Sequence, residues 1–179
     1  SYTTHVKETH AEFGFPVKQI SLIPNILDDR FVRDTPPQAE EPIRLLFVGR
    51  LEVAKGADKL VPILRRVRNR SERNVTLTIA GSGQLRSDIE RQTADIGLER
   101  HVKFLGHVPY LDMPEVYGTH DVLLSPTEWE EPFGRIYLEA LASGTPVVAS
   151  DVGSAAEILG DGGVLTDGDV AAMADAVVE

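Results

Sequence analysis

The sequence predicts an α/β fold, a Rossmann-like, doubly wound parallel sheet. Short apolar runs typical of buried strands alternate with amphipathic helix patterns from Ile43 onward. A glycine follows several of these runs directly, as at Gly49, Gly81 and Gly106. Repeated β–α units of this length place parallel strands side by side with helices on both faces of the sheet.

Composition narrows the function classes. The 179 residues fit one domain, and 42% apolar with 26% charged residues is ordinary for a soluble globular protein. The absence of cysteine excludes disulfides, thiolate zinc sites and thiol nucleophiles, and we expect a reducing, cytoplasmic setting. A net charge of −10 disfavours nucleic acid as a partner, so an anionic ligand would depend on a few local cations and backbone N–H groups.

Residues 1–42 are expected to be a linker with a leading strand. The alternation over 17–23 predicts a short strand, closed by a turn at Pro24-Asn25. From Asp28 to Pro42 the chain is rich in proline and acidic residues, which predicts an extended surface segment. The start at Ser1 and an uncapped last helix lead us to expect a piece trimmed at both ends, with C-terminal helices missing.

Residues 43–179 carry the alternating elements in order. The first strand, 43–48, precedes a helix pattern through Leu60, Leu64 and Val67 with Asp58 as the expected N-cap. The next strand, 75–80, precedes a helix from Leu85 that Gly97 ends. Further strands are expected at 102–105, 122–124 and 146–149, and further helices at 113–117, at 133–142 and from 170 to the end.

Ligands of such sheets bind at the carboxyl ends of the strands. After the first strand, Arg50 and Lys55 flank a turn bounded by glycines and could grip a diphosphate, although solvated loop cations explain them equally well. After the second strand, Gly81-Ser-Gly83 more often marks a turn than a dinucleotide fingerprint, whose third glycine would fall at Arg86. His107, after the third strand, is more typical of a surface residue than of a catalyst.

The stretch after the fourth strand, residues 125–140, is the most informative. The N–H groups of Phe133, Gly134 and Arg135 should lie free at a helix N-terminus, where the helix dipole favours an anion. Glu131 lies just before this helix and Glu139 about two turns into it. Carboxylates beside an anion site need hydrogen-bond donors such as sugar hydroxyls, unless the loop is simply a glutamate-rich surface.

Asp167-Gly-Asp169 has the D-x-D spacing of metal-dependent sugar transferases, but it lies in a turn where Asp169 suits a helix N-cap. We therefore expect no metal site there, and no other cluster has metal-ligand spacing.

Several motifs together resemble a known family, the retaining glycosyltransferases of family 4. They are Gly49-Arg-Leu-x-x-x-Lys-Gly56, Ile79-Ala-Gly-Ser-Gly83, Val102-Lys-Phe-Leu-Gly106, Glu131-Pro-Phe-Gly134 with Glu139-Ala140, and Gly144-Thr-Pro-Val-Val-Ala149. In this order they resemble the C-terminal, donor-binding domain of the GT-B fold, one half of that fold, and Ile23-Pro-Asn25 resembles the peptide that leads into it. The resemblance covers nearly all of the chain from Ile43 onward.

The resemblance implies a role for each matched position. Arg50 and Lys55 would hold the donor diphosphate, and Glu131 would bind hydroxyls of the donor sugar. Glu139 would bind the ribose. The remaining substrate-binding positions implied are Gly49, Gly81, Ser82, Gly83, His107, Val108, Phe133, Gly134 and Arg135. The donor would be a nucleoside-diphosphate sugar of the UDP or GDP type, with no metal or other cofactor.

The resemblance also implies a partner, because the acceptor-binding N-terminal half of the GT-B fold is missing. We expect this chain to bind donor weakly without turnover, and any peripheral membrane association to reside in the missing half. Ser154 departs mildly from the family, where many members have the second of two glycines.

Three other readings stay open. A nucleotide-sugar epimerase of the GT-B type shares the architecture but places different residues at the diphosphate, so the Glu131/Glu139 pair favours the transferase. A dinucleotide-binding oxidoreductase domain would need the third glycine. A flavodoxin-like regulatory module would leave Arg50 and Lys55 without a reason to meet those glutamates.

Overall fold

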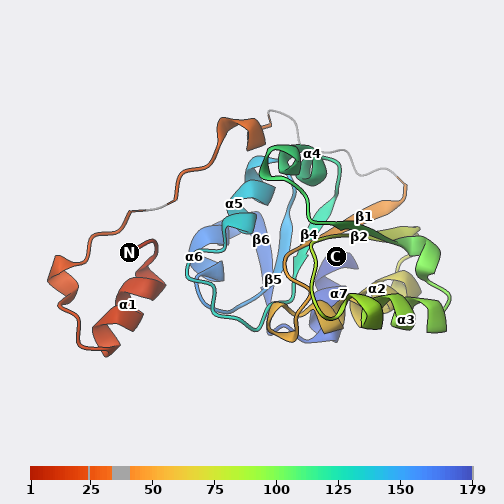
Figure 1. Ribbon diagram of the computed structural model, residues 1–179, viewed down its shortest axis with the longest axis horizontal. Coiled ribbons are helices and arrows are strands. Elements are labelled where there is room, and N and C mark those ends of the chain that lie inside the picture. The colour runs from red at the N-terminus through yellow and green to blue at the C-terminus, as the bar shows by residue number, and fades with distance from the viewer. Residues whose placement is uncertain (24, 34–40, 179) are drawn as a thin grey trace.

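Six parallel strands form the centre of the computed structural model, which describes residues 1–23, 25–33 and 41–178. Across the sheet the order is β3-β2-β1-β4-β5-β6 (Figure 1). The strands are β1 (Ile43–Val48), β2 (Val75–Ala80), β3 (Val102–Gly106), β4 (Val122–Ser125), β5 (Val147–Ser150) and β6 (Gly163–Thr166). The predicted Rossmann-like, doubly wound parallel sheet is confirmed.

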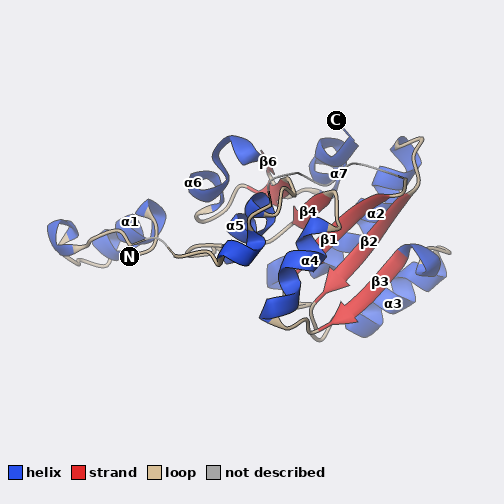
Figure 2. Ribbon diagram, turned by 90° about the horizontal axis from the view of Figure 1, so that it is seen from above, coloured by secondary structure: helices blue, strands red, loops and turns tan. Residues whose placement is uncertain are grey.

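Helices cover both faces of the sheet (Figures 1 and 2). On one face α2 (Leu60–Arg70), α3 (Arg86–Asp95) and α7 (Val170–Val178) pack over a core that includes Leu64, Ile89 and Met173. On the other, α4 (Met113–Gly118), α5 (Arg135–Ala142) and α6 (Ala155–Leu159) pack over Tyr117, Tyr137 and Leu159. The helices change face because the chain returns from edge strand β3 to the centre and then builds outward from β1 in the other direction.

Most predicted elements form, within about one residue for the strands. β6 and α6 were not predicted, and the helix predicted from 133 begins at Arg135. Asp169 caps α7 as expected, since its Oδ2 accepts a hydrogen bond from the Ala171 N–H at 2.7 Å.

The predicted N-cap role of Asp58 is wrong. A 3₁₀ turn, Ala57–Lys59, leads directly into α2 and places Asp58 inside the turn. Its buried Oδ1 accepts no hydrogen bond from the described part of the chain.

The strand predicted over 17–23 does not form. Val17–Gln19 is a 3₁₀ turn, and the residues from 20 to 23 have no regular structure, because no strand of the described ranges pairs with them. The proline of the predicted turn lies outside the described residues, as do residues 34–40 of the predicted linker. The helix α1 (Thr4–Glu12) was not predicted and buries none of its side chains. Phe31, within the predicted surface segment, is instead buried in the core.

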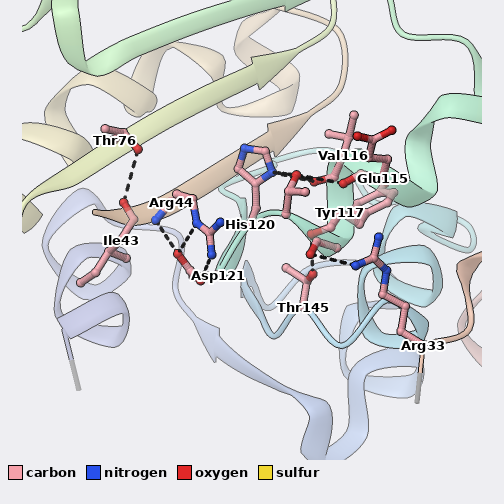
Figure 3. Close-up of polar contacts among 12 residues, drawn as sticks. Arg33, Ile43, Arg44, Thr76, Glu115, Val116, Tyr117, His120, Asp121 and Thr145 are labelled. Carbon is pink, nitrogen blue, oxygen red and sulfur yellow. Dashed lines mark hydrogen bonds and ion pairs between the residues drawn. The ribbon is translucent and has the colours of Figure 1, made fainter. Parts of the chain in front are cut away.

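The amino ends of β1 and β4 are joined by an ion pair that Figure 3 shows. The Asp121 carboxylate accepts the Arg44 N–H at 2.7 Å and the Arg44 guanidinium at 3.0 Å. Asp121 is almost fully buried, so this pair helps fix the register at the end of the sheet opposite the predicted site. None of the helices in the described ranges is long and apolar enough to cross a membrane.

Candidate functional site

The crevice for a ligand lies between the carboxyl ends of β1 and β4. These strands are neighbours, yet the chain leaves them toward opposite edges of the sheet, so the loops after them separate. The two loops still contact each other, because the carbonyl of Ala54 accepts hydrogen bonds from the Thr127 hydroxyl at 3.1 Å and from the Glu128 N–H at 3.0 Å. Parallel topology thus brings together the Arg50/Lys55 loop and the Glu131 loop, which the sequence places about 80 residues apart.

A pocket of about 320 Å³ opens between these loops, and we call it the Lys55 pocket. Predicted site residues from both loops line it, beside side chains of β1 and α5. The lining residues are Phe47, Val48, Gly49, Arg50, Lys55, Ser125, Thr127, Glu131, Gly134, Arg135, Ile136 and Tyr137.

Inside the Lys55 pocket the Lys55 ammonium forms an ion pair with Oε1 of Glu131. The two side chains are only 18% and 27% exposed, so water screens the pair incompletely. Arg50 is different: its side chain is 68% exposed and pairs with Glu52 at 3.0 Å, so it can move toward a ligand at little cost. Burial lowers the pKa of Lys55, and the nearby Arg50 guanidinium lowers it further.

The main chain of the Glu131 loop is held from two sides. The Glu131 carbonyl accepts hydrogen bonds from the Ser154 N–H at 3.2 Å and the Ser154 hydroxyl at 2.9 Å. The Thr3 hydroxyl donates to the Pro132 carbonyl at 2.9 Å. The Ser154 hydroxyl therefore adds a hydrogen bond that the glycine expected from the resemblance would lack.

Helix α5 begins at the edge of the Lys55 pocket. Gly134 is its N-cap, with φ of +58° in the left-handed region, and no side chain caps the helix. The first N–H groups of a helix have no partners within it and carry the positive end of its dipole. The lining by Gly134, Arg135 and Ile136 therefore gives this pocket an anion-binding end.

A second pocket, of about 360 Å³, shares Val48, Gly49 and Arg50 with the first, and we call it the Glu139 pocket. It lies beyond the ends of β1, β2 and β3. Its other lining residues are Ala80, Gly81, Ser82, His107, Val108, Tyr110, Met113 and Glu139. The two pockets thus form neighbouring compartments along one edge of the sheet.

Glu139 is a carboxylate buried to 6% exposure, with a donor at each oxygen. Oε2 accepts from the Tyr117 hydroxyl at 2.9 Å, and Oε1 accepts from the Arg135 guanidinium at 3.1 Å. Burial and the neighbouring Glu139 raise the pKa of Tyr117 well above its usual value, so the hydroxyl stays protonated. Arg135 also lies over the Tyr110 ring, 5.1 Å from its centroid.

Gly81 is required where the loops after β1 and β2 touch. Its φ is +152°, and a Cβ there would overlap the carbonyl oxygen of Gly49. Gly83 instead lies against the Leu51 backbone and lines neither pocket. The glycine pattern of this loop is therefore explained largely by close backbone approach, as the turn interpretation predicted.

The structure brings eleven of the thirteen predicted site residues into the lining of these two pockets. Gly83 and Phe133 are the exceptions. Phe133 was expected to offer its N–H beside Gly134, but it lines neither pocket, and its buried ring packs against Tyr2 in a T-shaped arrangement with 6.3 Å between the centroids. Glu139 lies one turn into α5, not two, because the helix begins at Arg135.

Sequence reasoning missed the aromatic and hydroxyl side chains behind the glutamates. Tyr117 supports Glu139, and the Tyr137 hydroxyl pairs with Ser125 at 3.0 Å in the wall of the Lys55 pocket. Tyr137 lies within residues 125–140, the stretch that the sequence marked as most informative, so it could have been considered there. Tyr117 had none, because its contact depends on how α4 packs against α5.

A larger cavity, about 640 Å³, lies away from the predicted residues. Arg44, Thr76, Lys103 and His120 are among its lining side chains, over the face of β1, β2 and β3 that α4 covers only in part. Size alone would favour it. We place the site in the two smaller pockets because they hold the converging charges and lie at the carboxyl ends of the strands.

The chain resembles known proteins over most of its length. The profile of the family Glycosyl transferases group 1 matches residues 28–179. Glycogen synthase of Mycobacterium tuberculosis is 36% identical over 171 residues, which cover 92% of this chain and 40% of that protein. A GDP-mannose-dependent alpha-(1-6)-phosphatidylinositol monomannoside mannosyltransferase of Mycolicibacterium smegmatis is 33% identical, covering 92% of this chain and 47% of that protein.

Solved structures share the fold. The crystal structure of Anabaena Alr3699/HepE in complex with UDP superposes with a TM-score of 0.79 at 24% identity. The match covers 94% of this chain and 50% of that one. The chain therefore spans half or less of the length of these relatives.

Proposed function

The chain belongs to the glycosyl transferases group 1 family, and from that premise we propose that it is the nucleoside-diphosphate-sugar-binding domain of a retaining glycosyltransferase. The observation that carries the proposal is the pair of adjoining pockets that share Gly49 and Arg50. One compartment has cations and a helix N-terminus, and the other has a buried carboxylate. A nucleoside diphosphate matches this arrangement, because it has an anionic diphosphate at one end, suited to the cations, and ribose hydroxyls further along, suited to the carboxylate.

The Lys55 pocket would receive the diphosphate and the donor sugar. Lys55, Arg50 and the start of α5 line the same pocket, and the two cations with the helix N–H groups would together offset the diphosphate charge. In the reaction, negative charge builds on the departing diphosphate as the bond to the anomeric carbon breaks. Once Lys55 leaves Glu131 and Arg50 leaves Glu52, these groups would stabilise that charge, a role we propose for them without a metal or other cofactor.

Glu131 would orient the sugar ring by accepting hydrogen bonds from its hydroxyls. Its carboxylate is engaged by Lys55 in the free chain. A diphosphate that takes over Lys55 would therefore leave Glu131 available to the sugar beside it. The two Ser154 hydrogen bonds hold the Glu131 main chain in place during this exchange.

The Glu139 pocket would receive the nucleoside, with Glu139 accepting from the ribose hydroxyls. Gly81, Ser82, His107 and Val108 would surround the base. We propose a UDP-type or GDP-type donor; a relative named for GDP-mannose and a fold neighbour with bound UDP support both choices.

A second domain of the same polypeptide would bind the acceptor and close over the sugar. The relatives are at least twice as long as the part matched here. In the N-terminal segment Phe13, Ile23 and Ile26 are exposed by 80%, 67% and 95%, which suits a surface that another domain covers. On this proposal the chain alone binds donor but does not turn it over, and sustained transferase activity by it would contradict the proposal.

Calorimetric titration with UDP, GDP, ADP and NAD tests the proposal. One nucleoside diphosphate should bind, and both Arg50→Ala and Glu139→Ala should weaken it, by about tenfold each. Arg91→Ala, which removes an exposed arginine of α3 paired with Asp88, is the control for loss of positive charge. Binding of NAD alone, or equal binding by all variants, would contradict the proposed function.

A further inference from the structure

The Glu139 carboxylate has two supports of unequal rigidity. Tyr117, which holds Oε2, is fully buried, whereas the Arg135 side chain that holds Oε1 is 54% exposed. An exposed guanidinium can rotate away or follow a ligand at little cost. A buried hydroxyl in a packed core has one arrangement.

Both the main chain and the ring of Tyr117 are held in place. Its carbonyl accepts the Thr145 hydroxyl at 2.8 Å, a bond drawn in Figure 3. The ring packs against Phe31, with 6.0 Å between centroids, inside the core beneath α4 and α5. Because the Tyr117 hydroxyl stays protonated and lies next to a carboxylate, it acts as the donor in this pair.

A carboxylate oxygen has more than one lone-pair direction, so the bond from Tyr117 does not exhaust Oε2. This hydrogen bond does favour one rotation of the Glu139 carboxylate about its Cγ–Cδ bond. The remaining lone pairs then have a fixed direction at the wall of the Glu139 pocket, which Gly81 and Ser82 also line. Orientation of this kind by a group behind the ligand-binding residue strengthens binding without any contact to the ligand.

We propose that Tyr117 is a positioning residue, whose hydroxyl holds the Glu139 carboxylate in the orientation that accepts the ribose hydroxyls of a bound nucleotide. The inference rests on the proposed function and adds a residue to it. Arg135 contributes charge to the same carboxylate, but its side chain is 54% exposed, so it can leave Oε1 at lower cost than the buried Tyr117 can leave Oε2.

The test compares nucleotides with and without the ribose hydroxyls. Wild-type chain and Tyr117→Phe are titrated with UDP, GDP and ADP, and then with the 2′,3′-dideoxy form of whichever binds most tightly. Tyr117→Phe should bind the ribonucleotide about tenfold more weakly, because one hydrogen bond to a charged group is lost. Its affinity for the dideoxy form should equal that of the wild type.

Two further variants separate positioning from packing. Arg135→Gln should keep the wild-type ratio of ribonucleotide to dideoxynucleotide affinity, and collapse of that ratio would overturn the inference in favour of Arg135. Ser143→Ala, which removes another buried hydroxyl bonded to the Phe31 carbonyl at 3.2 Å, should change neither affinity.

Equal losses for both nucleotides in Tyr117→Phe, or no loss for either, would overturn the inference while leaving the proposed function intact. Failure of the wild type to bind any of the three ribonucleotides would instead overturn the proposed function, and the inference with it.

Discussion

Glu131→Gln should strengthen the binding of a nucleoside diphosphate that lacks its sugar. In the free chain the Glu131 carboxylate forms an ion pair with Lys55, one of the two cations proposed to hold the diphosphate. Glutamine keeps the shape of the side chain and a carbonyl oxygen but removes the charge. The substitution therefore removes a competitor for Lys55 and a source of repulsion against the diphosphate.

The size of this gain follows from the exposure of the pair. Two unit charges about 4 Å apart interact by about 4 kcal/mol at an effective dielectric constant of about 20, and by about 1 kcal/mol in water. Only 18% and 27% of the two side chains are exposed, which by itself favours the higher figure. The glutamine amide oxygen of the variant can still accept a hydrogen bond from Lys55, however, so most of the interaction is kept and the lower figure is the better guide. We therefore expect a gain of about 1 kcal/mol, or about fivefold tighter binding.

Calorimetric titration of four proteins measures it: wild type, Glu131→Gln, Lys55→Met and the double variant. The gain from Glu131→Gln should appear with Lys55 present, disappear in the Lys55→Met background and shrink as salt is raised. A gain of equal size without Lys55 would mean general repulsion, not competition for Lys55. Weaker binding by Glu131→Gln than by the wild type would show that Glu131 does not compete with the diphosphate for Lys55.

Three further predictions concern stability. Gly81→Ala should lower the free energy of unfolding by about 3 kcal/mol in urea titrations, because a Cβ overlaps the Gly49 carbonyl at a φ that favours glycine; an unchanged midpoint would contradict the close approach of these loops. Asp121→Asn should lower the free energy of unfolding by about 2 kcal/mol in the same assay, since it removes the buried negative charge that pairs with the part-exposed Arg44. A decrease below about 0.5 kcal/mol would show that the pair contributes no more than an exposed ion pair does. Burial lowers the pKa of His120 in the folded state, so near and below its ordinary pKa of about 6.5 the unfolded state binds more protons than the folded state. The free energy of unfolding of the wild type should therefore fall relative to that of His120→Asn as pH drops from about 8 to about 5. Parallel curves of unfolding free energy against pH for the two proteins would contradict this.

Much of the fold was predictable because central parallel strands are buried on both faces. Leu45, Leu46 and Phe47 are all buried and read as a continuous apolar run. β6 escaped prediction because it is a four-residue edge strand with Val164 49% exposed, so no such run exists. α6 has five residues, too few to show a helical period. The strand predicted over 17–23 failed because alternation shows only that a segment could pair.

The site was predictable as far as the strand ends determine it. Loops after parallel strands must meet at one edge, which places Arg50, Lys55, Glu131 and Gly134 together. What lies behind them depends on helix packing, which no local pattern encodes. Tyr117 meets Glu139 across 22 residues because α4 packs against α5, and neither residue type nor spacing announces that contact.

A structure of this chain with its tightest-binding nucleoside diphosphate would show directly which pocket receives the diphosphate and which receives the ribose. We expect the diphosphate to lie against Lys55, Arg50 and the start of α5, and the ribose hydroxyls to lie on Glu139, across the two pockets that share Gly49. A nucleotide bound instead in the larger cavity beside Lys103 and His120, or with its ends reversed, would contradict it.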